Sequence, residues 1–231
     1  MSVFYRLFLK RFLDIVFSGI SLIVFAPLIL FLMFLISINL GSPVMFKQRR
    51  PGKNGKIFTL HKFRTMTGEK DENGILLPDE MRLTKFGKFL RTASMDELPE
   101  LWDIFRGKMS VVGPRPQLIK DLVFMDDEIK KRHNARPGLT GLAQISGRNN
   151  LTWDERFAYD LQYVKKITFL KDTAIFFRTF AKVFKRSDIA TDGMATSMDY
   201  GDWLLSEGRI SEEEYYVKMI LNNDKEKDKI C

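Results

Sequence analysis

The sequence predicts an α+β protein, in which an N-terminal helical hairpin in a membrane precedes a mainly helical domain with a small β-hairpin. Three observations predict this fold. Residues 15–38 carry no charged side chain, which is typical of a membrane segment. Residues 44–49 and 56–63 read as two strands, and the strong turn sequence PGKNG at residues 51–55 joins them. Further along the chain, apolar residues recur at the spacing of amphipathic helices.

Length, charge and cysteine content narrow the class of protein. The 231 residues suffice for one domain with a sizeable core. The formal net charge of +8 predicts an anionic partner: lipid headgroups, phosphates or nucleic acid. We do not expect nucleic acid, because the basic residues are scattered and no reading motif is present. Because Cys231 is the only cysteine, no intramolecular disulfide can form, and with His61 and His133 it makes no zinc-ligand spacing.

The apolar segment at residues 15–38 is long enough to cross a membrane, at about 1.5 Å per helical residue. Its flanks are basic on both sides, with Lys10 and Arg11 before it and further basic side chains at residues 47–53. Basic flanks mark the cytoplasmic side of a membrane, so both ends are expected there. Pro27 removes a helical hydrogen bond and favours a bend. These features fit a re-entrant hairpin or, alternatively, a single tilted span kinked at Pro27.

Composition divides the chain into a membrane anchor at residues 1–42, a folded domain at 43–190 and a C-terminal extension without an assigned role at 191–231. Lys62 and Arg64 end the predicted β-hairpin, where they either meet an anion or are simply solvated. Residues 68–82 are polar and predict a mobile loop. Residues 83–90 predict a short basic amphipathic helix.

The stretch at residues 91–102 combines two adjacent carboxylates, Asp96 and Glu97, with an upstream Arg91. We expect a helix to begin here, because Pro99 fits a first turn. The positive potential at a helix start suits a phosphate and keeps a nearby carboxylate ionised, so Asp96 could attack a phosphate. The alternative is a capping box, in which Glu97 returns to the backbone N–H of Ser94 and Asp96 only complements the helix dipole.

Two further loops carry arginines that suit phosphate recognition. Arg115 lies between two prolines, so its guanidinium is presented from a stiff backbone; a rigid surface turn would have the same sequence. Residues 136–150 contain glycines that let a ligand approach the backbone closely. This loop is neither a P-loop nor a dinucleotide fingerprint. Its candidate contacts to phosphate, ribose or base are Arg136, Thr140, Gln144 and Arg148.

Residues 167–186 predict a helix with two distinct faces. One face gathers the basic residues Lys171, Arg178, Lys182 and Lys185. The opposite face gathers Phe169, Phe176, Phe180 and Phe184. Such a helix either lies flat on an anionic membrane as an interfacial helix or packs on the core as an ordinary surface helix.

Taken together and in this order, these motifs resemble the bacterial sugar transferases, the monotopic phosphoglycosyl transferases. The resemblance covers residues 10–201 and is closest to the compact form that starts N-linked glycan synthesis in some bacteria. The motifs that carry it are Lys10–Arg11 with Asp14, Lys62–Phe63–Arg64–Thr65–Met66, Arg91 with Asp96–Glu97–Leu98–Pro99, Gly113–Pro114–Arg115–Pro116, and Arg136–Pro137–Gly138 with Gln144 and Gly147–Arg148–Asn149. The resemblance favours a catalytic Asp96 over the capping box. One departure is Ala26, where the family often has serine before the proline that breaks the helix.

The resemblance implies a two-step transfer. Asp96 would attack the β-phosphate of a UDP-sugar and release UMP, and a membrane polyprenyl phosphate such as undecaprenyl phosphate would then take the phosphosugar. Mg²⁺ is expected as a cofactor, with Asp96 as its contacting carboxylate. Glu97 would either orient the site or take a proton from the lipid phosphate. The residues expected to hold phosphates are Arg91, Arg115, Arg136 and Arg148, with Lys62 and Gln144 as weaker candidates.

The resemblance also implies a place in the cell and a set of partners. The chain would be monotopic on the cytoplasmic face of the bacterial inner membrane, anchored re-entrantly through Lys10, Arg11 and Pro27. The step would be the first membrane step of glycan, exopolysaccharide or glycoprotein assembly. Membrane lipids, a second copy of the chain or downstream glycosyltransferases would be its partners. The rival functions are a membrane-bound phosphatase or nucleotidyl transferase, and a non-catalytic anion-binding adaptor.

Overall fold

The computed structural model describes residues 2–147, 150–184 and 198–227. Its α-helices are α1 (Ser2–Phe4), α2 (Lys10–Leu40), α3 (Asp79–Arg82), α4 (Lys85–Thr92), α5 (Glu100–Phe105), α6 (Asp127–Lys130), α7 (Leu142–Ser146), α8 (Trp153–Lys165), α9 (Phe169–Phe184), α10 (Tyr200–Ser206) and α11 (Glu212–Lys227). Its strands are β1 (Met45–Pro51), β2 (Ile57–Phe63), β3 (Ser110–Val112) and β4 (Gly138–Thr140). A π-helix, η1 (Tyr5–Leu9), precedes α2, and the 3₁₀ turns are η2 (Lys53–Gly55), η3 (Met95–Glu97), η4 (Lys120–Val123) and η5 (Lys131–Asn134).

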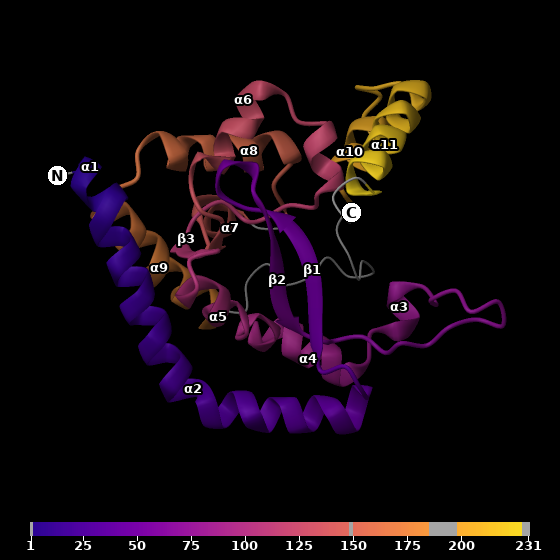
Figure 1. Ribbon diagram of the computed structural model, residues 1–231, viewed down its shortest axis with the longest axis horizontal. Coiled ribbons are helices and arrows are strands. Elements are labelled where there is room, and N and C mark those ends of the chain that lie inside the picture. Colours follow the sequence, from indigo (N-terminus) through magenta and orange to yellow (C-terminus); the bar gives the residue numbers. More distant parts are fainter. Residues whose placement is uncertain (1, 148–149, 185–197, 228–231) are drawn as a thin grey trace.

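The N-terminal apolar segment forms one continuous helix, α2, which bends partway along its length (Figure 1). Pro27 lies inside this helix, where its ring removes one backbone hydrogen bond. The predicted bend is therefore confirmed, as a bent single helix rather than two antiparallel ones. Tyr5–Leu40 is long and apolar enough to cross a membrane by length and composition. Its re-entrant topology stays a prediction.

The first turns of α2 are tied to the rest of the protein by polar contacts. Lys10 Nζ lies 2.6 Å from Asp172 Oδ2 on α9, and Tyr5 Oη donates to the same oxygen at 2.7 Å. Arg11 donates to the carbonyls of Ile104 and Phe105 at 2.6 and 2.8 Å, at the C-terminal end of α5. Lys10 and Arg11, predicted as membrane-anchor cations, thus attach α2 to α9 and α5. Both side chains contact groups of the protein itself.

The rest of α2 presents a broad apolar face to the outside. Its most exposed side chains include Phe12, Ile20, Ile23, Val24, Leu30, Phe31, Phe34 and Ile38. Exposed apolar residues on α9 are Phe169, Leu170, Phe177 and Phe180. Exposed apolar side chains in this number are typical of surfaces that contact a lipid or another protein. The helix predicted at residues 167–186 is present as α9, and its interfacial role stays a prediction; Lys185 and Arg186 lie outside the described residues, as does the side chain of Phe184.

The predicted β-hairpin is confirmed. Strands β1 and β2 pair antiparallel, with Met45 opposite Phe63 and Pro51 opposite Ile57. The connecting turn holds Asn54 at φ 56°, a left-handed conformation that asparagine tolerates. Lys62 lies near the end of β2, and its side chain reaches the middle of the domain.

A second sheet departs from the prediction for residues 136–150. That segment, expected to be a loop, forms strand β4 and helix α7. Strand β4 pairs parallel with β3, with Ser110 opposite Gly138 and Val112 opposite Thr140. The two strands are too short and too far apart in sequence for local patterning to reveal them. The predicted loop at 68–82 also has more structure than expected, with a bridge between Lys70 and Leu76 and helix α3.

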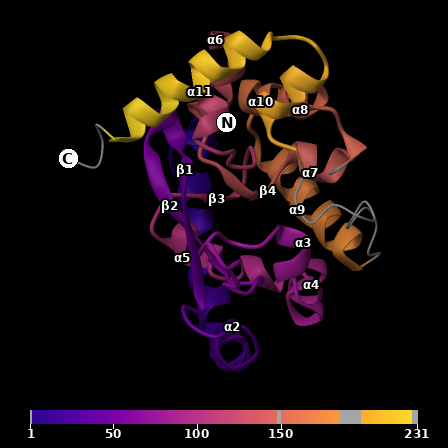
Figure 2. The same ribbon diagram turned by 90° about the vertical axis from the view of Figure 1, so that its right-hand side faces the viewer.

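Three apolar clusters make up the interior. The largest joins β2, α5, β3, α8 and α9, and a second joins the far half of α2 to β2 and α4. The third includes Phe124, Trp153 and Phe157 together with Tyr200 and Leu204 of α10. Helices α10 and α11 lie at the opposite end of the molecule from the far half of α2 (Figures 1 and 2). The described part of the C-terminal extension therefore has a structural role in packing, which the sequence did not reveal.

Candidate active site

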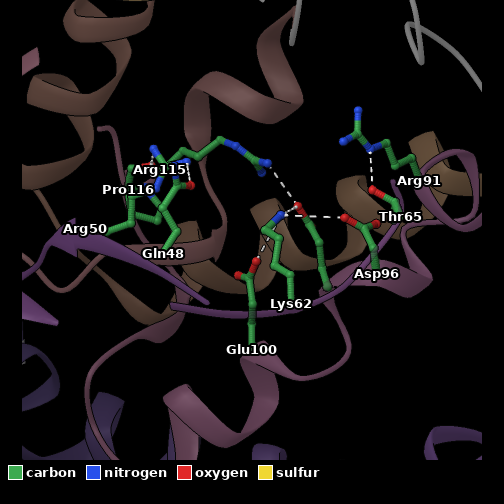
Figure 3. Close-up of polar contacts among 10 residues, drawn as sticks. Gln48, Arg50, Lys62, Thr65, Arg91, Asp96, Glu100, Arg115 and Pro116 are labelled. Atoms are coloured by element: carbon green, nitrogen blue, oxygen red, sulfur yellow. Dashed lines mark hydrogen bonds and ion pairs between the residues drawn. The ribbon is translucent and has the colours of Figure 1, made fainter. Parts of the chain in front are cut away.

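Three predicted site residues, Lys62, Asp96 and Glu97, meet where β2, η3 and α5 converge. Lys62, near the end of β2, places its Nζ within 4 Å of three carboxylates (Figure 3). The distances are 2.6 Å to Glu97, 3.2 Å to Glu100 and 3.8 Å to Asp96. Glu97 and Glu100 lie within hydrogen-bond distance of the ammonium, whereas Asp96 lies farther from it. One lysine thus gathers three acids, of which Asp96 is the least engaged.

Arg115 approaches this group from the loop after β3. Its Nη2 donates to Glu97 Oε1 at 2.9 Å, while about half of its side chain remains exposed. Gly113 at the start of the loop lies against the backbone of Arg136, because an added Cβ would come within 2.3 Å of that carbonyl oxygen. Glu97 therefore accepts hydrogen bonds from two cations on separate segments.

Arg91 reaches the other side of Asp96 from the last turn of α4. Its Nε donates to the hydroxyl of Thr65 at 2.9 Å, and its positive charge lowers the pKa of Asp96. Gly87 of the same helix lies directly on Thr65, where an added Cβ would be 1.8 Å from the carbonyl oxygen. Only glycine permits this approach. The absence of a side chain at position 87 therefore allows α4 to pack closely on the segment after β2.

The capping-box interpretation is wrong. Ser94 adopts a left-handed conformation at φ 54°, and its side chain makes no capping hydrogen bond. The carboxylate of Glu97 is bonded to Lys62 and Arg115 instead. Asp96 and Glu97 lie in the turn η3, and α5 begins three residues after Glu97, at Glu100. Left-handed conformations of residues other than glycine are uncommon and cluster at functional sites, as here.

Burial and neighbouring charges set the protonation of the three acids differently. Burial, followed by the charge of Glu97, raises the pKa of Asp96 to about 6. Burial would also raise the pKa of Glu97, but Lys62 and Arg115 hold it well below its usual range. Burial and the charge of Glu97 raise the pKa of Glu100 to about 8. At neutral pH, Asp96 and Glu97 are ionised and Glu100 holds a proton.

Glu100 is a site residue that sequence reasoning missed. Its side chain is 5% exposed, and it shares Lys62 with the two predicted carboxylates. A signal was present in the sequence: Glu100 follows Asp96 and Glu97 by four and three residues, a spacing that places side chains on one face of a helical turn.

Three predicted phosphate-binding residues lie elsewhere or outside the description. Arg136 donates from Nε to the carbonyl of Gly107 at 3.0 Å and lies near Arg11, so the structure does not bring it to Asp96. Both amide atoms of Gln144 are buried and make no hydrogen bond among the described residues, which is costly without a ligand. Arg148 lies outside the described residues.

The donor set fits a magnesium ion that also uses substrate oxygens. Within the described residues no cluster of three or more acidic, histidine or cysteine ligands forms a metal cage. Mg²⁺ is commonly bound by one or two carboxylates together with substrate phosphates and water. Asp96 is the carboxylate that suits this role, because Lys62 lies closer to Glu97 and Glu100 than to Asp96.

Comparisons with known proteins agree with these features. The chain is 44% identical over 189 residues to an uncharacterized sugar transferase, EpsL, of Bacillus subtilis, covering 82% of this chain and 94% of that protein. It is 39% identical over 193 residues to the exopolysaccharide production protein ExoY of Rhizobium meliloti, covering 75% and 84%. It is 38% identical over 198 residues to the undecaprenyl-phosphate galactose phosphotransferase of Salmonella typhimurium, covering 78% of this chain but only 41% of that longer protein.

The family described as bacterial sugar transferase matches residues 5–186, from η1 to beyond the end of α9. This range includes the bent helix, the β-hairpin and the carboxylate cluster around Lys62. The chain belongs to the bacterial sugar transferase family.

Proposed function

We propose that this protein transfers a sugar-1-phosphate from a UDP-sugar to undecaprenyl phosphate, giving undecaprenyl-diphospho-sugar and UMP. Relatives named as undecaprenyl-phosphate galactose and glucose phosphate transferases support this reaction class. The observation that carries the proposal is the arrangement of Asp96 beside the pair formed by Lys62 and Glu97.

Asp96 has the properties of a nucleophile. Its side chain is 13% exposed, so a substrate can reach a carboxylate that is only partly hydrated. Its pKa of about 6 makes it more basic than an ordinary aspartate, yet it remains ionised at neutral pH. Glu97 and Glu100 are less suitable, because Lys62 contacts both of them more closely.

The reaction then proceeds in two displacements. A carboxylate oxygen of Asp96 forms a bond to the β-phosphorus, and the bond from that phosphorus to the bridging oxygen breaks, so UMP leaves with its electron pair. The sugar phosphate is now held on Asp96 as an acyl phosphate. A phosphate oxygen of undecaprenyl phosphate attacks the same phosphorus, which restores the Asp96 carboxylate and completes the lipid diphosphate.

The neighbouring residues stabilise charge and fix geometry. Glu97 is ionised and bonded to two cations, which supports an orienting role for it over proton transfer. Lys62, Arg115 and Arg91 surround the two carboxylates and would stabilise the phosphate oxygens of the transition state. Mg²⁺, held by Asp96 and the diphosphate, would offset repulsion between the nucleophile and the substrate.

The anchor would bring the site to its lipid substrate. We infer that α2 enters the membrane and returns to the cytoplasmic face, with its apolar outer face in contact with lipid. The phosphate of the polyprenol lies at headgroup level, while the sugar nucleotide arrives from the cytosol. A site on a domain attached to such a helix can meet both substrates.

A radiolabelled UDP-sugar tests the transfer. Membranes containing the protein should release UMP and pass sugar label into organic-extractable lipid, and chelation of divalent cations should stop both. Asp96→Asn should abolish transfer and trapping of label on the protein. The control Asp127→Asn changes a fully exposed carboxylate and should retain activity. Near-normal turnover by Asp96→Asn would show that the nucleophile is another group.

Cysteine labelling tests the topology. In a background with Cys231→Ser, single cysteines at the exposed positions Phe4 and Lys47 flank the membrane helix. A membrane-impermeant maleimide should label both in inverted vesicles and neither in intact spheroplasts. Labelling of the two positions from opposite faces would establish a spanning helix and exclude re-entry.

A further inference from the structure

A second arginine contacts the backbone of the loop that carries Arg115. Arg115 is half exposed, yet its guanidinium lies on Glu97. Long exposed side chains lose rotamer entropy when they are fixed, and they are fixed well only when their backbone is fixed first. The contacts that hold this backbone therefore matter for the site.

The start of the loop is held by β4. The N–H of Gly113 donates to the carbonyl of Thr140 at 2.8 Å, and the N–H of Gly138 donates to the carbonyl of Pro114 at 2.9 Å. The proline at position 116 has no N–H to offer. The carbonyl of Arg115 itself is bonded by Arg132 of η5, whose Nη2 donates to it at 2.6 Å.

Arg132 is itself fixed more firmly than the residue it contacts. Its side chain is 1% exposed. Its Nε and Nη2 both donate to Oδ2 of the equally buried Asp160, at 3.0 and 2.6 Å. Its guanidinium also lies over the ring of Phe157, 5.5 Å from the ring centre. One nitrogen, Nη2, thus joins the buried pair to the backbone of Arg115.

A buried ion pair of this kind is weak evidence for stability. Removing both charges from water is expensive, and apolar replacements of such pairs are often neutral or stabilising. The pair instead provides an immobile, charged donor at one backbone carbonyl, which a neutral side chain would bond less strongly. The hydrogen bond that Arg132 makes outside the pair goes to the carbonyl of Arg115.

We propose that Arg132, held by Asp160, is a positioning residue that keeps the guanidinium of Arg115 on Glu97. This inference rests on the proposed function, because it assigns a role to Arg115 in that site. Arg132 touches neither Asp96 nor Glu97 and acts only through the backbone of Arg115.

A double-mutant cycle with the full-length protein in membranes tests the proposal. Arg132→Gln should lower kcat/KM for the UDP-sugar at least tenfold. In an Arg115→Ala background the same change should lower it less than twofold, because the side chain that Arg132 positions is already gone. Arg132→Lys should be intermediate, since one ammonium cannot bond Asp160 and the Arg115 carbonyl as a guanidinium does.

Two control variants separate positioning from stability. Arg209 makes a comparable pair with Asp154 and lies over an aromatic ring, but both partners are half exposed and distant from the loop, so Arg209→Gln should keep full kcat/KM. Leu204→Ala removes buried apolar contacts and should lower the unfolding temperature without this pattern. Equal losses from Arg132→Gln in both Arg115 backgrounds would overturn the proposal.

Hydrogen exchange provides a readout independent of activity. Arg132→Gln should increase backbone exchange in the peptide spanning residues 110–118, and Leu204→Ala should not. If the wild-type protein transfers no sugar phosphate, the proposed function fails, while faster exchange at 110–118 still supports the contact. Unchanged exchange at 110–118 would refute the positioning role even in an active enzyme.

Discussion

At the scale of single residues, the site consists of one lysine shared by three acids with unequal properties. Lys62 contacts Glu97 and Glu100 closely and Asp96 more loosely. Burial, followed by the negative charge of Glu97, raises the pKa of both Asp96 and Glu100. The arrangement leaves Asp96 ionised at neutral pH but more basic than a solvated aspartate.

Replacing Lys62 by methionine should abolish most of the activity. The change keeps the side-chain length but leaves the acids around position 62 without their shared cation. We expect a decrease in kcat/KM of at least about 100-fold, the scale for losing one charge-stabilising donor in an active site. The assay is transfer of radiolabelled sugar phosphate to lipid. Lys47→Met, an exposed lysine in the paired strand β1, is the matched control and should retain activity.

Replacing Glu100 by glutamine should change the pH dependence of stability. Folding raises the pKa of Glu100 from 4.5 to about 8, so the folded protein binds this proton more tightly than the unfolded chain does. The stabilisation that this proton provides is therefore lost as the pH rises from about 4.5 to about 8. A glutamine at position 100 shows no such dependence.

The measurement for Glu100→Gln is the unfolding temperature near pH 5 and near pH 8.5. The unfolding temperature of the variant, relative to that of the wild type, should increase with pH. Glu128→Gln, an exposed residue, should show no such trend. A difference that stays constant across this range would mean that Glu100 is ionised in the folded protein.

At the scale of elements, polar side chains position the long apolar helix. Tyr5 and Lys10 converge on Asp172 of α9, and Tyr163 of α8 donates to its other oxygen at 2.8 Å. Asp14 on α2 accepts from the backbone N–H of Val111 at 3.0 Å. These contacts fix the direction in which α2 leaves the domain, whereas contacts of its apolar face are not directional.

Replacing Asp172 by asparagine should destabilise the attachment of α2. The partly buried ammonium of Lys10 would lose its closest counter-charge, at a cost of about 3 kcal/mol, the lower end for a buried pair. Thermal unfolding in detergent or nanodiscs measures this loss. The control Asp127→Asn removes a fully exposed partner of Lys130 and should leave the unfolding temperature unchanged. Equal stability of the two variants would contradict a structural role for the Asp172 cluster.

At the scale of the whole molecule, the far half of the bent apolar helix α2 and the C-terminal helices α10 and α11 lie at opposite ends (Figures 1 and 2). Helices α10 and α11 cover an aromatic cluster with Phe124, Trp153 and Phe157. Phe157 is shared by this cluster and by the guanidinium of Arg132, which lies over its ring.

Truncation after residue 190 should therefore reduce stability and activity together. Loss of Tyr200 and Leu204 would expose the rings of Trp153 and Phe157 to water. The expected results are a lower unfolding temperature and a decreased yield of folded protein. Removal of residues 228–231 alone serves as a control and should change neither. Full stability of the longer truncation would show that the third cluster does not need α10 and α11.

The sequence by itself determined the features that depend on neighbouring residues. The turn at residues 51–55 predicted the β-hairpin, Pro27 predicted a bend in α2, and the apolar run at 15–38 predicted most of that helix. The order of motifs predicted the family by resemblance, and the resemblance in turn implied the role of Asp96. The hairpin and the bend follow from local backbone preference and the apolar helix from its composition, which a single chain records directly.

Only the tertiary structure decided which polar groups meet. Lys62 and Glu97 are 35 residues apart, Arg132 and Arg115 are 17 apart, and Lys10 and Asp172 are 162 apart. Such contacts depend on how strands and helices pack, and no local pattern encodes them. For this reason the prediction included Arg136, which donates to the carbonyl of Gly107. Glu100 has a helical spacing from Asp96 and Glu97, but only its contact with Lys62 shows that it belongs to the site.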